Sequence, residues 1–250
     1  MFYFKKTIKP LIKGKKKTAG RNNQGLITSR HRGGGFKQKY RLIDFKRKFD
    51  QSAIICGIFY DPNRTANIAL VALFSCNQGL TFRFILATQG IKNGDVIKTF
   101  HPSSIKYAFS SQIKEGFCIP LEKFPQGSFV NCIESMPGKG FTLIRSAGCS
   151  GRIVFKNTKY VDVELPSKQV KRFSGGCRAV SGELSNPAHF LNKFVKAGQL
   201  RWLGRRPRVR GVAINPVDHP HGGGEGKGNV GRPSVSPWGR LTKRKIFPRK

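Results

Sequence analysis

Positive charge is distributed very unevenly along this chain, and that distribution limits the folds open to it. Residues 1–50 hold 16 Lys and Arg against 2 Asp and Glu, and residues 196–250 hold 14 against 2. The 145 residues between them hold only 17 against 8, within a chain of formal charge +35. Segments with so much charge repel themselves and bury too little apolar surface to fold alone. The sequence predicts a folded middle and two arms that become ordered on a polyanion.

Nucleic acid is the expected polyanion, because no basic amphipathic helix is long enough to lie on a membrane surface. The longest apolar stretch, Ala66–Phe74, is half of a membrane span at most. Met1–Phe4 is too short for the apolar core of a signal peptide, and residues 1–43 favour Lys where transit peptides favour Arg. We therefore expect no membrane partner.

The cysteines form no Cys-x-x-Cys pair, and no histidine lies at zinc-ligand spacing from any of them. This spacing predicts reduced, half-buried thiols in strands and no metal held by the protein. The residues concerned are Cys56, Cys76, Cys118, Cys132, Cys149 and Cys177.

Apolar, partly β-branched runs separated by turn residues predict a first series of strands, typical of a small antiparallel barrel. These runs are Ile54–Tyr60, Ala66–Phe74, Leu80–Ala87 and Val96–Phe100. A second series predicts another small barrel, with a boundary near Pro120–Pro125. Its runs are Phe129–Ile133, Thr142–Ala147, Arg152–Phe155, Tyr160–Leu165, Gln169–Phe173 and Arg178–Val180.

One helix is predicted after the second series. Asn186 is a good N-cap residue, Pro187 suits the first helical position, and Gly198 suits the end. An apolar stripe at helical spacing lies between them, formed by Phe190, Leu191, Phe194 and Val195.

The first basic motif, residues 29–41, combines glycines that let the backbone approach phosphates with cations that neutralise them. Phe36 and Tyr40 offer rings for stacking on unpaired bases. The alternative is a solvated basic loop. The predicted RNA-binding residues are Arg30, His31, Arg32, Gly33, Gly34, Gly35, Lys37, Lys39, Tyr40 and Arg41.

The second basic motif, residues 201–210, presents arginines that bind phosphate with two parallel hydrogen bonds. Arginines two positions apart would share one side of an extended chain. Trp202 is either a stacking face or a core anchor. The predicted RNA-binding residues are Arg201, Trp202, Arg205, Arg206, Arg208 and Arg210.

The third motif, residues 215–226, places two histidines and two carboxylates close together, which invites an enzymatic or metal-site interpretation. His219-Pro220-His221 lacks the i, i+4 spacing of a zinc-hydrolase pair, and no Ser or Cys stands in a nucleophile elbow. The glycine cluster also lacks the spacing of a phosphate-binding loop of nucleotide hydrolases. We expect a rigid turn packed on RNA, formed by Asp218, His219, His221, Gly222, Gly223 and Gly224.

Seven segments, in this order, resemble bacterial-type large-subunit ribosomal protein number two, the universal L-two family. They are GRNNQG (20–25), RHRGGGFK (30–37), YDPNRTANIALV (60–71), PGKG (137–140), RSAG (145–148), AGQLRWLGRRPRVRG (197–211) and NPVDHPHGGGEG (215–226). The resemblance implies an oligonucleotide-binding (OB) barrel followed by an SH3-like barrel. The expected organisation is a basic arm (1–43), the OB domain (44–122), the SH3-like domain with its helix (123–197) and a basic extension (198–250).

The family resemblance also implies a role. The expected function is to bind 23S-type ribosomal RNA and to support the peptidyl-transferase region, subunit association and tRNA binding. Arg21, Lys139 and Arg145 lie in matching motifs and join the expected RNA contacts. His219 matches the family's most discussed histidine. Expected partners are large-subunit RNA, neighbouring ribosomal proteins and, indirectly, the small subunit, without a cofactor beyond Mg²⁺ bound to the RNA and without a small-molecule substrate.

Two alternatives belong to other classes of protein. One is an enzyme that uses Asp218, His219 and His221, and the other is a general nucleic-acid coating protein. Phe141 departs from the family pattern, in which a second glycine usually follows PGKG, and the N-terminal arm is shorter than usual. The 20 Phe, with abundant Ile, Asn and Lys, favour an AT-rich organellar genome. We expect a mitochondrial ribosome, with a plastid or the bacterial cytoplasm as alternatives.

Overall fold

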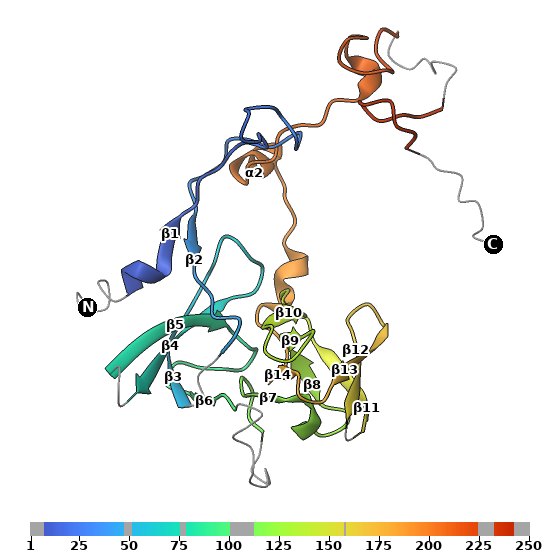
Figure 1. Ribbon diagram of the computed structural model, residues 1–250. Coiled ribbons are helices and arrows are strands. Elements are labelled where there is room, and N and C mark those ends of the chain that lie inside the picture. Colours follow the sequence, from blue (N-terminus) through green and yellow to red (C-terminus); the bar gives the residue numbers. More distant parts are fainter. Residues whose placement is uncertain are drawn as a thin grey trace, which may run out of the picture. The chain divides into compact units, whose positions relative to one another are not determined.

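The computed structural model (Figure 1) describes residues 8–47, 52–75, 79–100, 113–157, 159–224 and 233–242. The chain divides into two units, and each combines segments far apart in sequence. The first unit is Met1–Lys16 with Lys37–Lys193, and the second is Lys17–Phe36 with Phe194–Lys250. The architecture is mostly β, as the alternating apolar patterns predict.

The first predicted strand series forms an antiparallel sheet in the first unit. Its strands are β3 (Ser52–Phe59), β4 (Ile68–Ser75), β5 (Gly79–Leu86) and β6 (Val96–Lys98), in the order β5-β4-β3-β6. Exposed and buried residues alternate along β3 because successive side chains point to opposite faces. Ala53, Ile55 and Ile97 are buried in one apolar cluster with residues of β4 and β5. The four predicted strands are confirmed.

The second series forms a six-stranded sheet in the same unit, in the order β13-β12-β11-β8-β14-β7. Its strands are β7 (Cys118–Pro120), β8 (Phe129–Asn131), β11 (Gly151–Lys156), β12 (Tyr160–Glu164), β13 (Val170–Ser174) and β14 (Arg178–Ser181). A separate pair joins β9 (Ile133–Glu134) to β10 (Phe141–Leu143). Val161 and Val163 are fully buried, which confirms the alternation expected of β12.

In the second series, two predicted strands are shorter than expected, and strand β7 was not predicted. The run Phe129–Ile133 is interrupted at Cys132, whose φ of 50° is incompatible with a continuous strand. The run Thr142–Ala147 ends early because Ile144 has a φ of 52°. Strand β7 pairs with β14 and carries too short an apolar run to be recognised.

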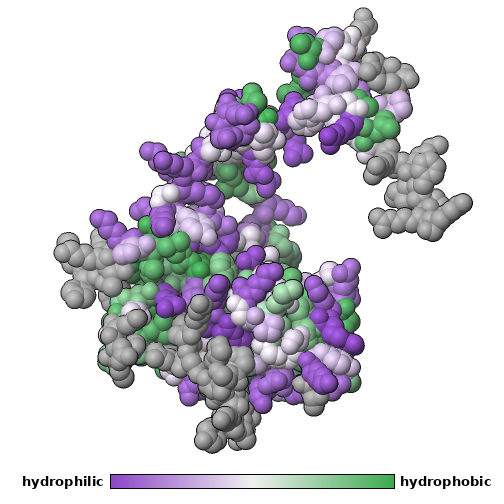
Figure 2. All heavy atoms as spheres, viewed as in Figure 1, coloured by the Kyte–Doolittle hydropathy of each residue, from purple (hydrophilic) through white to green (hydrophobic). Residues whose placement is uncertain are grey.

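The two sheets fit the OB and SH3-like barrels that the family resemblance implies, and they share part of their core. One apolar cluster joins Leu70 and Phe84 of the first sheet to Val180 of the second. Phe141, the departure from the family pattern, belongs to this cluster and is 4% exposed. Its side chain therefore fills core volume. Hydrophobic residues also gather on the surface over β4 and β5 (Figure 2).

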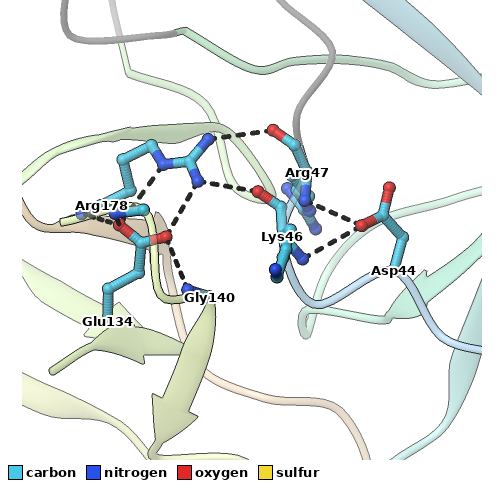
Figure 3. Close-up of polar contacts among 7 residues, drawn as sticks. Asp44, Lys46, Arg47, Glu134, Gly140 and Arg178 are labelled. Carbon is cyan, nitrogen blue, oxygen red and sulfur yellow. Dashed lines mark hydrogen bonds and ion pairs between the residues drawn. The ribbon is translucent and has the colours of Figure 1, made fainter. Parts of the chain in front are cut away.

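A buried arginine of the second sheet forms an ion pair and also binds the backbone of the segment before β3 (Figure 3). Arg178 donates to the carboxylate of Glu134 at 2.8 Å, and their side chains are 4% and 0% exposed. The same guanidinium donates to the backbone oxygens of Lys46 and Arg47 at 2.7 and 3.0 Å. Burial alone would lower the pKa of Arg178, but the hydrogen bond and charge of Glu134 raise it.

Two short strands form within the N-terminal arm. The sequence predicted this arm to have no regular secondary structure. Strand β1 (Ile12–Gly14) follows a 3₁₀-helix (Lys9–Leu11) and pairs with β2 (Lys39–Arg41). Asp61, fully buried in the turn before β4, accepts hydrogen bonds from Arg41 and Arg64. Burial would raise the pKa of Asp61, but the bonds from Arg64 and Asn63 lower it.

The predicted helix after the second series is wrong. A 3₁₀-helix (Pro187–Leu191) ends in the first unit, and α2 (Ala197–Trp202) begins in the second. Asn186 adopts a left-handed conformation, and its side-chain amide donates to the oxygen of Thr65 at 2.9 Å instead of capping a helix. Gly198 lies inside α2. The expected stripe of Phe190, Leu191, Phe194 and Val195 is 57–85% exposed.

Five cysteines are free thiols, while Cys76 lies outside the described residues. Burial raises the pKa of Cys118 to about 11 and that of Cys132 to about 12. In the described segments, no His, Cys, Asp and Glu side chains gather in threes that could hold a metal ion. The helices in the same segments are too short or too polar for a bilayer crossing.

Candidate nucleic-acid interface

The two basic motifs, far apart in sequence, pair with each other in the second unit. Arg32 and Arg205 form an antiparallel β-bridge. Three backbone hydrogen bonds extend this pairing: Gly33 N–H to the oxygen of Gly204 (3.0 Å), Phe36 N–H to that of Trp202 (2.9 Å) and Arg206 N–H to that of His31 (3.0 Å). The sequence predicted each motif separately but gave no sign of their pairing.

Glycine is required where the two motifs approach most closely. Gly35 has a φ of 82°, and a Cβ there would lie 2.6 Å from the nitrogen of Gly204 and 2.7 Å from the oxygen of Trp202. Gly204 has a φ of 86° and faces the oxygen of Gly34. Such conformations cost little only for glycine. These glycines therefore bring two cationic backbones into direct contact.

The paired motifs enclose a pocket of about 570 Å³, which we call the arginine pocket. Six arginines line it: Arg30, Arg32, Arg201, Arg205, Arg206 and Arg208. His31, Ala197, Leu200 and Pro207 complete the lining, and Nδ1 of His31 lies 3.1 Å from the oxygen of Pro207. No acidic side chain lines the pocket. Planar cations gathered without counter-charge make a site for phosphate groups.

Aromatic rings lie beside the pairing. The centroids of Phe36 and Trp202 are 6.2 Å apart, and the two residues are 66% and 54% exposed. A core anchor would be buried, so the structure favours the stacking interpretation of Trp202. Arg210 is also exposed and precedes a 3₁₀-helix (Gly211–Ala213). Arg21 is exposed as well and forms a β-bridge with Ile27.

The remaining predicted RNA contacts lie in the first unit. Lys37, Lys39 and Tyr40 are exposed on or next to β2. Lys139 is exposed in the turn between β9 and β10. Arg145 lies 5.1 Å from the ring centroid of Phe45. The remaining member of this set, Arg41 of β2, is an ion-pair partner of Asp61 at 3.3 Å.

The third motif folds into a compact loop around His219, which is 8% exposed. The N–H of His221 donates to Nδ1 of His219 at 3.0 Å, and the N–H of Val235 donates to Nε2 of His221 at 3.1 Å. Because each of these two ring nitrogens accepts a backbone hydrogen bond, neither carries a proton in this arrangement. Burial, with the nearby His221 and Arg30, lowers the pKa of His219.

Three glycines make this loop possible. A Cβ on Gly211 would lie 2.6–2.7 Å from atoms of the His219 ring, so the ring packs on bare backbone. A Cβ on Gly222 would lie 2.3 Å from the oxygen of Asn215. Gly223 has a φ of 82° and faces Pro216. Gly224 is exposed, while Glu225 and Gly226 lie outside the described residues.

The loop does not have the geometry of a catalytic site. The rings of His219 and His221 are 4.8 Å apart, but the accepting nitrogens are used by the loop's own backbone. Asp218 is exposed and directly precedes His219 in the sequence. Among the described residues, no contact is found between its carboxylate and the His219 ring. A general base needs a nitrogen that can reach substrate and an oriented partner. The arrangement therefore favours a rigid surface loop.

Comparison with known proteins supports a role in RNA binding. Residues 8–99 match the family model "Ribosomal Proteins L2, RNA binding N-terminal domain", and residues 114–239 match "Ribosomal Proteins L2, C-terminal domain". The chain is 48% identical over 237 residues to large ribosomal subunit protein uL2 of Wolbachia sp. subsp. Brugia malayi (strain TRS). The protein of the same name from Wolbachia pipientis wMel is also 48% identical over 237 residues. Both alignments cover 95% of this chain and 82% of the relative.

These relatives are structural proteins of the ribosome, and this family is not one of enzymes. The RNA-binding family domain covers both β1 and β2 and the first barrel. Together with the paired basic motifs and the two small barrels, these matches show that the chain belongs to the uL2 family of RNA-binding proteins of the large ribosomal subunit.

Proposed function

We propose that this protein binds 23S-type ribosomal RNA through the arginine pocket and holds that RNA in shape without chemistry of its own. The pocket is the observation that carries the proposal, because it gathers six arginines and no acid from two distant motifs. Backbone bonds fix the pairing, so the cations are held close together before RNA arrives. Phe36 and Trp202 add rings for stacking on unpaired bases.

The charge of the pocket predicts a strong dependence of RNA affinity on salt. If the arms neutralise about 6–10 phosphates, affinity falls by roughly 10³–10⁵-fold between about 50 and 200 mM salt. The test is equilibrium binding of the full chain to large-subunit RNA across this range. Replacing Arg32 and Arg208 with alanine should reduce the slope by about 0.7–0.9 for each phosphate that the variant no longer neutralises.

A charge-preserving variant is the matched control. Arg205→Lys keeps the cation but loses the planar fork, so the slope should hold while affinity falls. Binding that hardly changes with salt would refute the proposal that the cationic arms neutralise RNA phosphates. Equal affinity for duplex DNA would instead favour the general coating protein.

The His219 loop is proposed to approach the peptidyl-transferase region, and through it to support tRNA binding and subunit association. Support comes from the motif of residues 215–224 and from the bonds that make the loop rigid. Mg²⁺ would enter only with the RNA. Large subunits reconstituted with Gly211→Ala protein should assemble but transfer peptides more slowly, since the added Cβ displaces the His219 ring. Turnover of any substrate by the RNA-free protein would contradict this role.

The remaining proposed contacts are Arg21, Lys37, Lys39, Tyr40, Arg41, Lys139, Arg145 and Arg210, and neighbouring ribosomal proteins complete the set of partners. A mitochondrial ribosome is the proposed location, on the evidence of a composition with 20 Phe in 250 residues. The relatives reported above are bacterial, which favours the bacterial cytoplasm as the alternative. Fractionation of the source cells, followed by sedimentation of the large subunits, separates the two.

A further inference from the structure

Four residues form a cross-strand surface on the second sheet, which we call the Tyr160 platform. Phe155 of β11 lies opposite Asp162 of β12, which lies opposite Arg172 of β13. Tyr160 lies on the same face, two residues before Asp162. None of these residues belongs to the basic motifs or to the arginine pocket.

The platform fixes a guanidinium in one orientation. Nε and Nη2 of Arg172 donate to the two oxygens of Asp162 at 2.8 and 3.0 Å. Its central carbon lies 4.0 Å from the ring centroid of Tyr160. The Phe155 ring lies 6.3 Å from that of Tyr160, centroid to centroid. Tyr160 therefore covers one face of a guanidinium that is already held flat by its ion pair.

The barrel core does not need these side chains. Val161 and Val163, the neighbours of Asp162 on β12, are fully buried on the opposite face. The Arg172 side chain is 62% exposed and Phe155 is 47% exposed. A planar cation and an aromatic ring thus remain accessible on a rigid sheet, where a flat ligand can stack with little loss of conformational entropy.

The surrounding charge selects a polyanion as the ligand. Between residues 151 and 174, six cations stand against two acids: Arg152, Lys156, Lys159, Lys168, Lys171 and Arg172 against Asp162 and Glu164. Both acids are paired, Asp162 with Arg172 and Glu164 with Lys168. Arginine planes and aromatic rings in a positive field are the features that recognise unpaired bases in RNA.

We propose that the Tyr160 platform stacks an unpaired nucleobase of the large-subunit RNA. This inference rests on the proposed function and adds a base-stacking site, in the first unit, to the phosphate-binding pocket of the second. Base stacking on a ring accounts for about 5- to 150-fold in affinity for each base. Its contribution is distinct from that of charge, because stacking does not depend on counterion release.

The test uses the full chain and a transcript of large-subunit RNA at fixed salt. Tyr160→Ala and Arg172→Lys should each weaken binding by about 5- to 150-fold. Arg172→Lys keeps the charge, so its salt slope should match that of the wild type. Tyr160→Phe keeps the ring and should bind normally. Lys168→Ala removes a nearby cation without touching the platform and should weaken binding far less than Tyr160→Ala.

Photo-cross-linking identifies the contact directly. RNA containing 4-thiouridine should form an adduct with the peptide that carries Phe155 or Tyr160. Thermal unfolding of each variant separates lost stacking from lost folding, and Phe155→Ala replaces Tyr160→Ala if the latter does not fold.

Each outcome has a distinct meaning. Wild-type affinity for Tyr160→Ala and Arg172→Lys, with pocket variants weakened, would overturn the platform and leave the proposed function intact. Failure of the wild type to bind the RNA would overturn both. Normal RNA binding together with loss of a protein cross-link in assembled subunits would make the platform a protein-docking surface and also overturn the inference.

Discussion

Glu134→Ala tests how far the shared core depends on its buried ion pair. The Glu134 carboxylate accepts from Arg178 Nη2 at 2.8 Å and from the backbone N–H groups of Gly138, Gly140 and Arg178 at 3.1–3.3 Å. The substitution removes all these acceptors at once. It also leaves the Arg178 side chain, 4% exposed, without its counter-charge.

Removing one partner of a buried pair costs about 3–5 kcal/mol, because the other charge stays buried and uncompensated. The bonds from Arg178 to the oxygens of Lys46 and Arg47 remain and keep the cost within this range. At roughly 2–4 °C for each kcal/mol in a chain of this size, the thermal midpoint should fall by about 6–20 °C. Glu134→Gln keeps the volume and one oxygen, so its loss should be smaller.

The assay is unfolding by heat and by urea, monitored by circular dichroism. Asp162→Ala is the matched control, since Asp162 also accepts two bonds from one arginine but pairs with a side chain that is 62% exposed. Water screens such a pair, so the midpoints of unfolding in temperature and in urea should be almost those of the wild type. A loss below about 1 kcal/mol for Glu134→Ala would show that the buried pair does not stabilise the fold.

Three further predictions concern the loops and thiols. Gly35→Ala should disrupt the pairing of the basic motifs and weaken RNA binding, whereas Gly25→Ala, at a similar φ of 81° with no atom within 4 Å, should not. Because burial lowers the pKa of His219 below its usual 6.5, the loop keeps its full stability above that value and loses it as the pH falls below it. Amide hydrogen exchange in the loop, corrected for intrinsic rates, should therefore stay constant from about pH 8 to about pH 6.5 and accelerate as the pH is lowered to about 5. Buried Cys118, with its pKa raised to about 11, should resist alkylation until the chain unfolds, while exposed Cys56 reacts first.

The strands could be predicted from the sequence because their signals are local. Alternation of apolar residues and turn residues at short spacing located every strand of the first sheet. Local signals also led to one wrong prediction, the helix after the second strand series. Asn186-Pro187 and the apolar stripe satisfy the rules for a helix, but a tertiary bond to Thr65 holds Asn186 in a left-handed conformation. The oxygen of the Gln199 side chain then accepts from the N–H of Val195 and marks a new start for α2.

The functional surfaces were predicted only as lists of residues. Their arrangement depends on contacts between distant segments, which no local pattern contains. His31 and Pro207, which meet in the arginine pocket, are 176 positions apart. The Tyr160 platform was missed because its residues are ordinary strand residues until the register of β11–β13 places them together.

The placement of the acidic residues distinguishes the two units, although both are proposed to contact RNA. Every ion pair found in the described segments lies in the first unit, where Asp61, Asp162 and Glu134 each pair with arginine. In the second unit, backbone bonds hold six arginines around one pocket that no acid lines. Backbone bonds fix the position of these charges but do not neutralise them. We therefore expect the first unit to be stable alone, whereas the second should gain stability when phosphates bind in the arginine pocket.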